Sequence, residues 1–166
     1  ETGTLALLLV RDQRRMLIVK TWRPRNLSSL WLEIGHRLPF NGSSSGHALL
    51  SSLSEEMFER TVAEAAGDRG LTVERAQEIR RNGYAQLIAK GTVIADPSEY
   101  FTSTIHAVAK PFHSRDLSEP VIFTCGAMPA DLSLDRMRDE VAPALNDAVR
   151  ELERMMGQGS AVVMRG

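Results

Sequence analysis

The sequence contains a single cysteine, Cys125, among its 166 residues, and aromatic side chains make up only 5% of it. One cysteine cannot form an internal disulfide or a cysteine-rich metal cluster, so the reducing cytoplasm is the expected location. The charges nearly cancel, with 20 basic and 21 acidic residues, and no basic stripe is present, which argues against direct binding of nucleic acid. No apolar run is long enough to span a bilayer, so we expect no membrane partner.

A hydrophobic content of 43% over 166 residues is enough for one domain with a sizeable core. We expect that domain over residues 1–157 and a flexible tail over residues 158–166. The chain begins at Glu1, its first apolar run starts a few residues later, and no signal-peptide pattern precedes that run. These features are typical of a piece taken from a longer protein.

Hydrophobic patterns predict a hairpin near each end of the sequence, made of two strands joined by a polar loop. Because a hairpin gives antiparallel neighbours, we expect an α+β fold in which helices pack against a mostly antiparallel sheet. The expected strands cover residues 4–10, 16–22, 30–34, 104–112 and 120–125, with residues 84–94 as a further bent strand or small hairpin.

Capping residues and apolar spacing predict four helices. They are expected to begin at Ser45, Ser54, Thr72 and Ser133. We expect the third to stop at Asn82-Gly83. The fourth covers residues 133–156 and is expected to kink or break at Pro143, because an interior proline removes a helical hydrogen bond.

A loop of small residues leads into the first of these helices. Ser43, Ser44 and Ser45 lie between two glycines, so a ligand could approach the main chain closely. The first N–H groups of a helix lack intrahelical partners and can bind an anion or a carboxylate. An ordinary serine-capped helix that holds no ligand explains the same pattern. The residues alone leave both interpretations open.

Other candidate sites are weaker. Cys125 with His106 could form a thiol nucleophile, although a cysteine in an apolar strand is usually a small buried hydrophobe. Asp96, Glu99 and Tyr100 could form one polar wall of a pocket or an exposed turn. The two tryptophans, Trp22 and Trp31, could line a ligand cavity or pack in a core or dimer interface. A metal site would have to use His36, His47, His106, His113 and Asp96. None of these forms a close H-x-x-H or C-x-x-C pair, so no metal and no cofactor are expected.

Four motifs in order resemble the effector-binding domain of the IclR family of bacterial transcriptional regulators. GHRLPFNGSSSGHALL at residues 35–50 is similar to the family pattern G-x-x-L-P-L-H-x-T-A-x-G-x-A-L-L. RRNGY at residues 80–84 resembles R-x-x-G-Y, and IHAVAKPF at residues 105–112 resembles L-x-C-V-A-A-P-I. LSLDR at residues 132–136 resembles the L-T-x-D-R that opens the last helix of the domain. The resemblance covers the effector-binding domain and does not include the family's winged helix-turn-helix.

The resemblance implies a GAF-like domain with a small-molecule pocket between the sheet and the serine loop. In the family, backbone N–H groups of that loop hold an effector carboxylate, which places the donors at Ser44 and Ser45, next to Ser43. Matched positions add an acidic residue, Asp96 or alternatively Glu99, and the strand residues Ala107, Phe123 and Cys125, with Trp31 as a further candidate. Phe123, Cys125 and Ala107 stand where the family has hydroxyl and thiol groups. We therefore expect a carboxylate effector with an apolar or aromatic body.

These features predict a sensor domain, not an enzyme. Its expected partners are a small carboxylate, further copies of itself in a homodimer or tetramer, and operator DNA only through the winged helix-turn-helix domain. Three alternatives remain at this point: a GAF-type sensory module of another signalling protein, a small thiol enzyme using Cys125, and a purely structural dimerisation domain.

Overall fold

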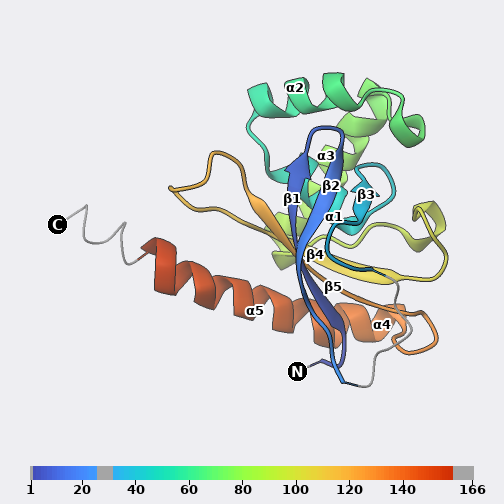
Figure 1. Cartoon of the computed structure of the whole chain (residues 1–166), viewed down its shortest axis with the longest axis vertical. Helices are drawn as coiled ribbons and strands as arrows, with labels where there is room; N and C mark the ends of the chain where they lie inside the picture. Colours follow the sequence, from blue (N-terminus) through green and yellow to red (C-terminus); the bar gives the residue numbers. More distant parts are fainter. Residues whose placement is uncertain (1, 26–31, 159–166) are drawn as a thin grey trace.

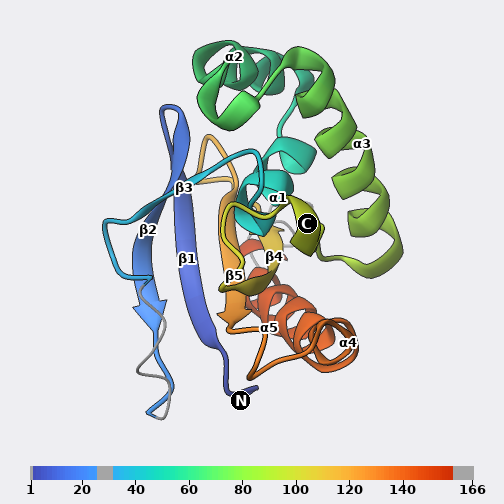
Figure 2. The same ribbon diagram turned by 90° about the vertical axis from the view of Figure 1, so that its right-hand side faces the viewer.

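A computed structural model describes residues 2–25 and 32–158. Its centre is an antiparallel five-stranded sheet in the order β3-β2-β1-β5-β4 (Figures 1 and 2). The strands are β1 (Leu5–Asp12), β2 (Arg15–Trp22), β3 (Arg37–Pro39), β4 (His106–Phe112) and β5 (Val121–Ala127). The antiparallel sheet and both predicted hairpins are confirmed.

Helices cover both faces of this sheet, because its strands are apolar on both sides. The helices of the first group are α1 (Ser44–Ser52), α2 (Glu55–Ala65) and α3 (Val73–Lys90). The C-terminal group is α4 (Leu134–Arg136), a π-helical stretch (Met137–Val141) and α5 (Ala142–Glu153). In Figure 1, α2 lies at one end of the molecule, and α5 runs across the other. No helix in residues 2–25 and 32–158 combines the length and the apolar character that crossing a membrane requires.

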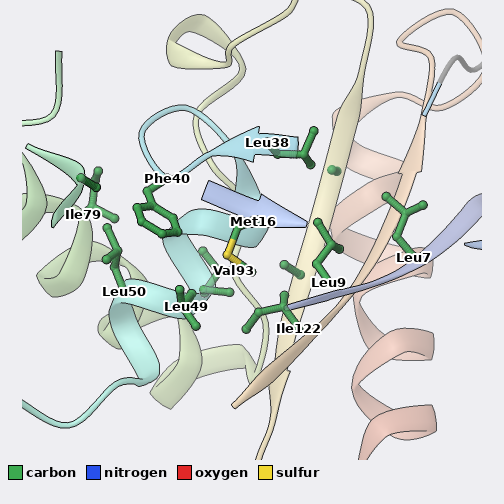
Figure 3. Close-up of a cluster of buried hydrophobic side chains, with 14 of the residues drawn as sticks. Leu7, Leu9, Met16, Leu38, Phe40, Leu49, Leu50, Ile79, Val93 and Ile122 are labelled. Atoms are coloured by element: carbon green, nitrogen blue, oxygen red, sulfur yellow. The ribbon is translucent and has the colours of Figure 1, made fainter. Parts of the chain in front are cut away.

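Two hydrophobic clusters hold these layers together, one on each face of the sheet. The larger cluster joins β1 and β2 to α1 and α3 through residues such as Leu9, Met16 and Leu49 (Figure 3). The smaller cluster joins β4 to the C-terminal helix through Val108 and Val141. Ala107 and Ala109 belong to the first cluster and Val108 to the second, so alternate residues of β4 face opposite helices.

The third strand was predicted in the wrong place. It is the three-residue β3, which pairs with the start of β2, and not residues 30–34. Residues 30 and 31 of the predicted segment lie outside the described part of the chain. Its last residue, Ile34, forms a turn with Gly35. A three-residue strand that ends at a proline carries almost no sequence signal, and proline is accepted there because β3 is an edge strand.

The third helix was predicted too short. Asn82-Gly83 does not end α3, and residues 84–90 are helical instead of β-like. A Cβ on Gly83 would lie 1.8 Å from Ser51 Oγ, so this glycine allows α1 and α3 to approach closely. The helix ends at Gly91, whose φ of +78° is the left-handed conformation and whose N–H donates to Leu87 O at 2.9 Å.

The chain remains helical through Pro143. The π-helical stretch directly before α5 places this proline at the first turn of a new helical segment, where its missing N–H costs little. The expected interruption is therefore a change of helix type. Met137 and Val141 lie within that stretch and are buried against the sheet, so packing supports it.

Candidate functional site

The N-terminus of α1 is the centre of the candidate site. Ser43 is the N-cap: its backbone is extended, its Oγ accepts from Gly46 N–H at 3.0 Å, and the same hydroxyl donates to Pro39 O at 2.6 Å. Gly46 is required here, because a Cβ would lie 2.4 Å from the Cα of Phe40. Ser43, Ser44 and Ser45 are all completely buried. The helix start is thus fixed rigidly inside the protein.

The hydroxyl groups of Ser44 and Ser45 attach α1 to the sheet. Ser44 Oγ donates to Ala107 O at 2.7 Å and accepts from Ala95 N–H at 3.0 Å. Ser45 Oγ and Thr124 Oγ1 are 2.8 Å apart. These side chains therefore have structural partners, and a ligand at this helix end would have to use backbone N–H groups.

The N–H of Ser44 has an unusual partner, the phenol oxygen of Tyr100 at 3.4 Å. Burial raises the pKa of Tyr100 to about 12, so the acceptor is a neutral hydroxyl. The positive end of a helix favours a negative charge, and a charged acceptor forms a shorter and stronger bond than a neutral one. The N–H of Ser44, at the positive end of α1, therefore has a weak and neutral acceptor.

Residues 95–101, which we call the strap, hold Tyr100 over this helix end. The Asp96 side chain accepts from Ser98 N–H and Oγ, and these hydrogen bonds lower the pKa of its carboxyl group. Glu99 pairs with Arg75 at 2.8 Å. Phe101 N–H donates to Gly42 O at 2.8 Å. Gly42 has a φ of +93°, and a Cβ there would lie 2.8 Å from Glu99 O, so the strap needs glycine at this position.

His47 connects the loop to the first turn of α1. Its Nε2 accepts a hydrogen bond from Gly42 N–H at 3.2 Å. Burial, with a smaller effect from the charge of Arg75, lowers the pKa of His47 to about 4. The imidazole is therefore neutral at physiological pH, and its acceptor role holds the glycine loop against the helix.

The residues predicted for the site are divided between the two faces of the sheet. Ala107 lies beside Ser44, and Asp96 and Glu99 lie on the strap. Phe123 and Cys125 instead pack towards α5, because alternate residues of β5 face opposite sides. Grouping them with the serine loop in one pocket was wrong. Trp31 lies outside the described residues.

Phe123 and Cys125 border a different cavity, of about 840 Å³, together with Trp22 and apolar side chains of α5. The rings of Trp22 and Phe123 are 6.4 Å apart and stacked. Burial raises the pKa of the Cys125 thiol, which keeps the reactive thiolate scarce at neutral pH, so its environment does not support the thiol-enzyme alternative. No group of three or more potential metal ligands occurs in the described part of the chain.

Two residues of the site were missed in the sequence. Thr124 faces the serine loop from the position between Phe123 and Cys125, and strand alternation counted from Ala107 through the hairpin register would have found it. Tyr100 was considered only as part of a polar wall. Its contact with Ser44 joins residues 56 positions apart, and no local pattern signals such a contact.

The sequence of this domain matches a known protein family. The family model for the C-terminal domain of the bacterial transcriptional regulator IclR matches residues 1–154. The chain belongs to the IclR family. This IclR domain has the GAF-like fold that the four motifs implied, and the alternative of a GAF module from an unrelated signalling protein is excluded. No curated protein sequence matches it closely.

Solved structures share the fold of this IclR domain at low sequence identity. An IclR family regulator from Brucella abortus has a TM-score of 0.76 and 20% identity, over 93% of this chain and 57% of the other. The Thermotoga maritima IclR has a TM-score of 0.72 and 14% identity, over 94% and 62%. The domain thus spans about three fifths of these regulators. The inducer-binding domain of an Acinetobacter PobR double mutant, in complex with 3-hydroxybenzoic acid, has a TM-score of 0.70 and 17% identity, over 91% and 88%.

Proposed function

We propose that this IclR domain senses a small aromatic carboxylate at the N-terminus of α1. In the full regulator, binding would alter how a winged helix-turn-helix domain contacts operator DNA. The family supports a sensory role, since its members are transcriptional regulators. The PobR domain of the same fold is bound to an aromatic carboxylic acid, 3-hydroxybenzoic acid.

The observation that carries this proposal is the contact between Ser44 N–H and Tyr100. An N–H at the positive end of a helix, fully buried, has only a neutral phenol oxygen at 3.4 Å as its acceptor. A carboxylate oxygen in the same place would be closer and charge-assisted, so it would compete well with the hydroxyl. Binding would therefore exchange one acceptor for a better one.

The shape of the effector follows from the group that it would displace. Tyr100 packs against Phe101, with ring centroids 5.1 Å apart, and against the larger hydrophobic cluster. A ligand that replaces this side chain would enter space that already accepts a six-membered ring with one oxygen. The expectation that the effector has an apolar body therefore rests on the space around Tyr100. It does not depend on Phe123 and Cys125, which face the other side of the sheet.

The same exchange supplies a mechanism for signalling. Displacing Tyr100 requires the strap to move, and the strap is attached to α3 through Arg75 and to the glycine loop through Gly42. A ligand that binds one arrangement of these elements better than another shifts their populations by its differential affinity. In a homodimer or tetramer, that shift would change the spacing of the DNA-binding domains.

A thermal-shift experiment tests the proposal directly. The probes are benzoate, 3-hydroxybenzoate, pyruvate and glyoxylate. A ligand at 100 times its dissociation constant adds about 2.7 kcal/mol, which raises Tm by several degrees. We expect the shift with the aromatic acids. Tight binding of pyruvate or glyoxylate with none of the aromatic acids would refute the aromatic class. A purely structural dimerisation domain would show no shift with any acid.

Two variants at one position separate the backbone donor from the hydroxyl. Ser44→Ala loses the bonds of Oγ but keeps the N–H, whereas Ser44→Pro loses both. Proline is tolerated at the first helical position, and both variants lack the same side-chain contacts. We expect the aromatic-acid shift to survive in Ser44→Ala and to disappear in Ser44→Pro. Equal loss in both would mean that the N–H is not the donor.

A further inference from the structure

The outward side of α3 carries an apolar stripe that no other element of the described chain covers. Val73, Tyr84 and Ile88 are 54%, 58% and 72% exposed, and Gln77 between them is exposed as well. Their spacing of four, seven and four residues puts them on one face of the helix. At 1.5 Å per residue the stripe is about 22 Å long. Figure 2 shows α3 along an outer edge of the molecule.

A groove of about 480 Å³ lies beside this stripe, between α2 and α3. Phe58 and Val62 of α2 border the groove on one side, and Val73 and Tyr84 of the stripe border it on the other. The groove and the stripe therefore form one continuous apolar surface. Burying such a surface against a partner is favourable, because it removes apolar area from water.

Two carboxylates of this groove lack ion-pair partners within the described part of the chain. They belong to Glu55 and Glu59, which lie on α2. The other two acidic residues of α2, Glu56 and Glu64, do not line the groove, and each pairs with an arginine. Unpaired carboxylates on this helix are thus confined to the edge of the groove.

Arg81 supplies the opposite charge at the other edge of the stripe. Its neighbour Arg80 lies over the Phe58 ring at 4.5 Å and donates to Leu50 O at 2.7 Å, so this guanidinium is bound within the chain on the side of α2. Successive residues of a helix are about 100° apart, which turns Arg81 away from α2. Arg81 is exposed and forms no ion pair within the described residues.

This surface, with an acidic edge, an apolar centre and a basic edge, is complementary to itself. A two-fold axis parallel to α3 would place Glu55 and Glu59 of one copy opposite Arg81 of the other, and stripe against stripe. An axis across α3 would instead place like charges together, which is unfavourable. A second copy of this chain therefore supplies every group that the surface lacks.

We propose that the α2–α3 surface is a homodimer interface in which two α3 helices pack side by side and parallel. The inference does not rest on the proposed function, because the interface uses no residue of the site at the N-terminus of α1. Only two helices of each copy take part. The dimer should therefore be reversible and depend on concentration, as is typical of small interfaces.

Sedimentation velocity over a range of protein concentrations tests the interface. We expect a monomer–dimer equilibrium that weakens with added salt, because exposed charge pairs are screened. Ile88→Ser should raise the dissociation constant by at least about tenfold, as for loss of an apolar anchor. Leu117→Ser is the matched control and should have no effect, since Leu117 is also exposed but lies between β4 and β5.

Charge reversal tests which edges meet. Arg81→Glu and Glu59→Lys should each weaken self-association by at least about tenfold, because like charges would then face each other. An equimolar mixture of the two variants should form a heterodimer, since each variant supplies the charge that the other needs. Glu56→Lys, on α2 but outside the groove, is the control and should associate like the natural sequence.

Three outcomes overturn the inference. A monomer at every concentration would show that a second copy does not cover this surface. Association that neither Ile88→Ser nor the charge reversals weaken would place the dimer contact elsewhere on the molecule. Failure of the mixture to associate, while both variants keep the circular dichroism spectrum of the natural sequence, would exclude the pairing of acidic with basic edges.

Discussion

His47 accepts a hydrogen bond from the N–H of Gly42 at 3.2 Å, and this bond exists only while the imidazole is neutral. In the folded protein the pKa of His47 is lowered to about 4, mainly by burial, from the ordinary histidine value of 6.5. Between about pH 4 and pH 6.5, His47 is therefore more often protonated in the unfolded chain than in the folded one. The stability from this residue is therefore complete above pH 6.5 and is lost as the pH falls towards 4.

We predict a loss of about 3 kcal/mol from this source between pH 7 and pH 4, at 1.36 kcal/mol for each unit of pKa difference. Denaturant unfolding at several pH values measures it. His47→Gln should be less stable than the natural sequence at pH 7, and the difference should shrink on acidification. His113→Gln, at an exposed position, is the matched control. Parallel pH profiles for His47→Gln and the natural sequence would contradict the prediction.

Tyr100→Phe should tighten the binding of an aromatic carboxylate. The phenylalanine keeps the ring but removes the oxygen that competes for Ser44 N–H at 3.4 Å. Losing one weak neutral hydrogen bond is worth about 0.5–1.5 kcal/mol, so affinity should rise roughly 2- to 10-fold. Isothermal titration with 3-hydroxybenzoate measures this change. Weaker binding would show that the hydroxyl contacts the ligand instead of competing with it.

Gly83→Ala should destabilise the protein, although alanine is the better helix former by about 1 kcal/mol. The added Cβ would lie 1.8 Å from Ser51 Oγ, so α1 and α3 must separate, at about 1–3 kcal/mol. Chemical denaturation of Gly83→Ala, Ser51→Ala and the double variant measures the coupling. The cost of Gly83→Ala should be smaller when Ser51 is alanine. Stabilisation by Gly83→Ala alone would mean that the helices are not in close contact.

Thr61→Val should stabilise the protein. Thr61 is 1% exposed, and its Oγ1 has no hydrogen-bond partner in the described part of the chain. Removing an unsatisfied buried hydroxyl while keeping the side-chain shape should gain about 1 kcal/mol. Thr124→Val is the matched control, since its hydroxyl bonds to Ser45 and its loss should destabilise. Changes of the same sign in both variants, measured by thermal unfolding, would contradict the argument.

The sequence by itself determined the hairpins, the serine cap of α1 and the family, because each depends on neighbours close in the chain or on ordered motifs. The sequence also shows that side chains alternate between the two faces of β4 and β5. The register between these two strands decides which residues share a face, and it places Thr124, and not Phe123 or Cys125, against the serine loop. The Asn82-Gly83 pair wrongly predicted the end of α3. The glycine is needed because α3 packs closely against Ser51 of α1, which is 32 positions away in the sequence. Tertiary structure alone brought Tyr100 to Ser44 and gave His47 its buried, neutral state, because both depend on segments that meet only after folding.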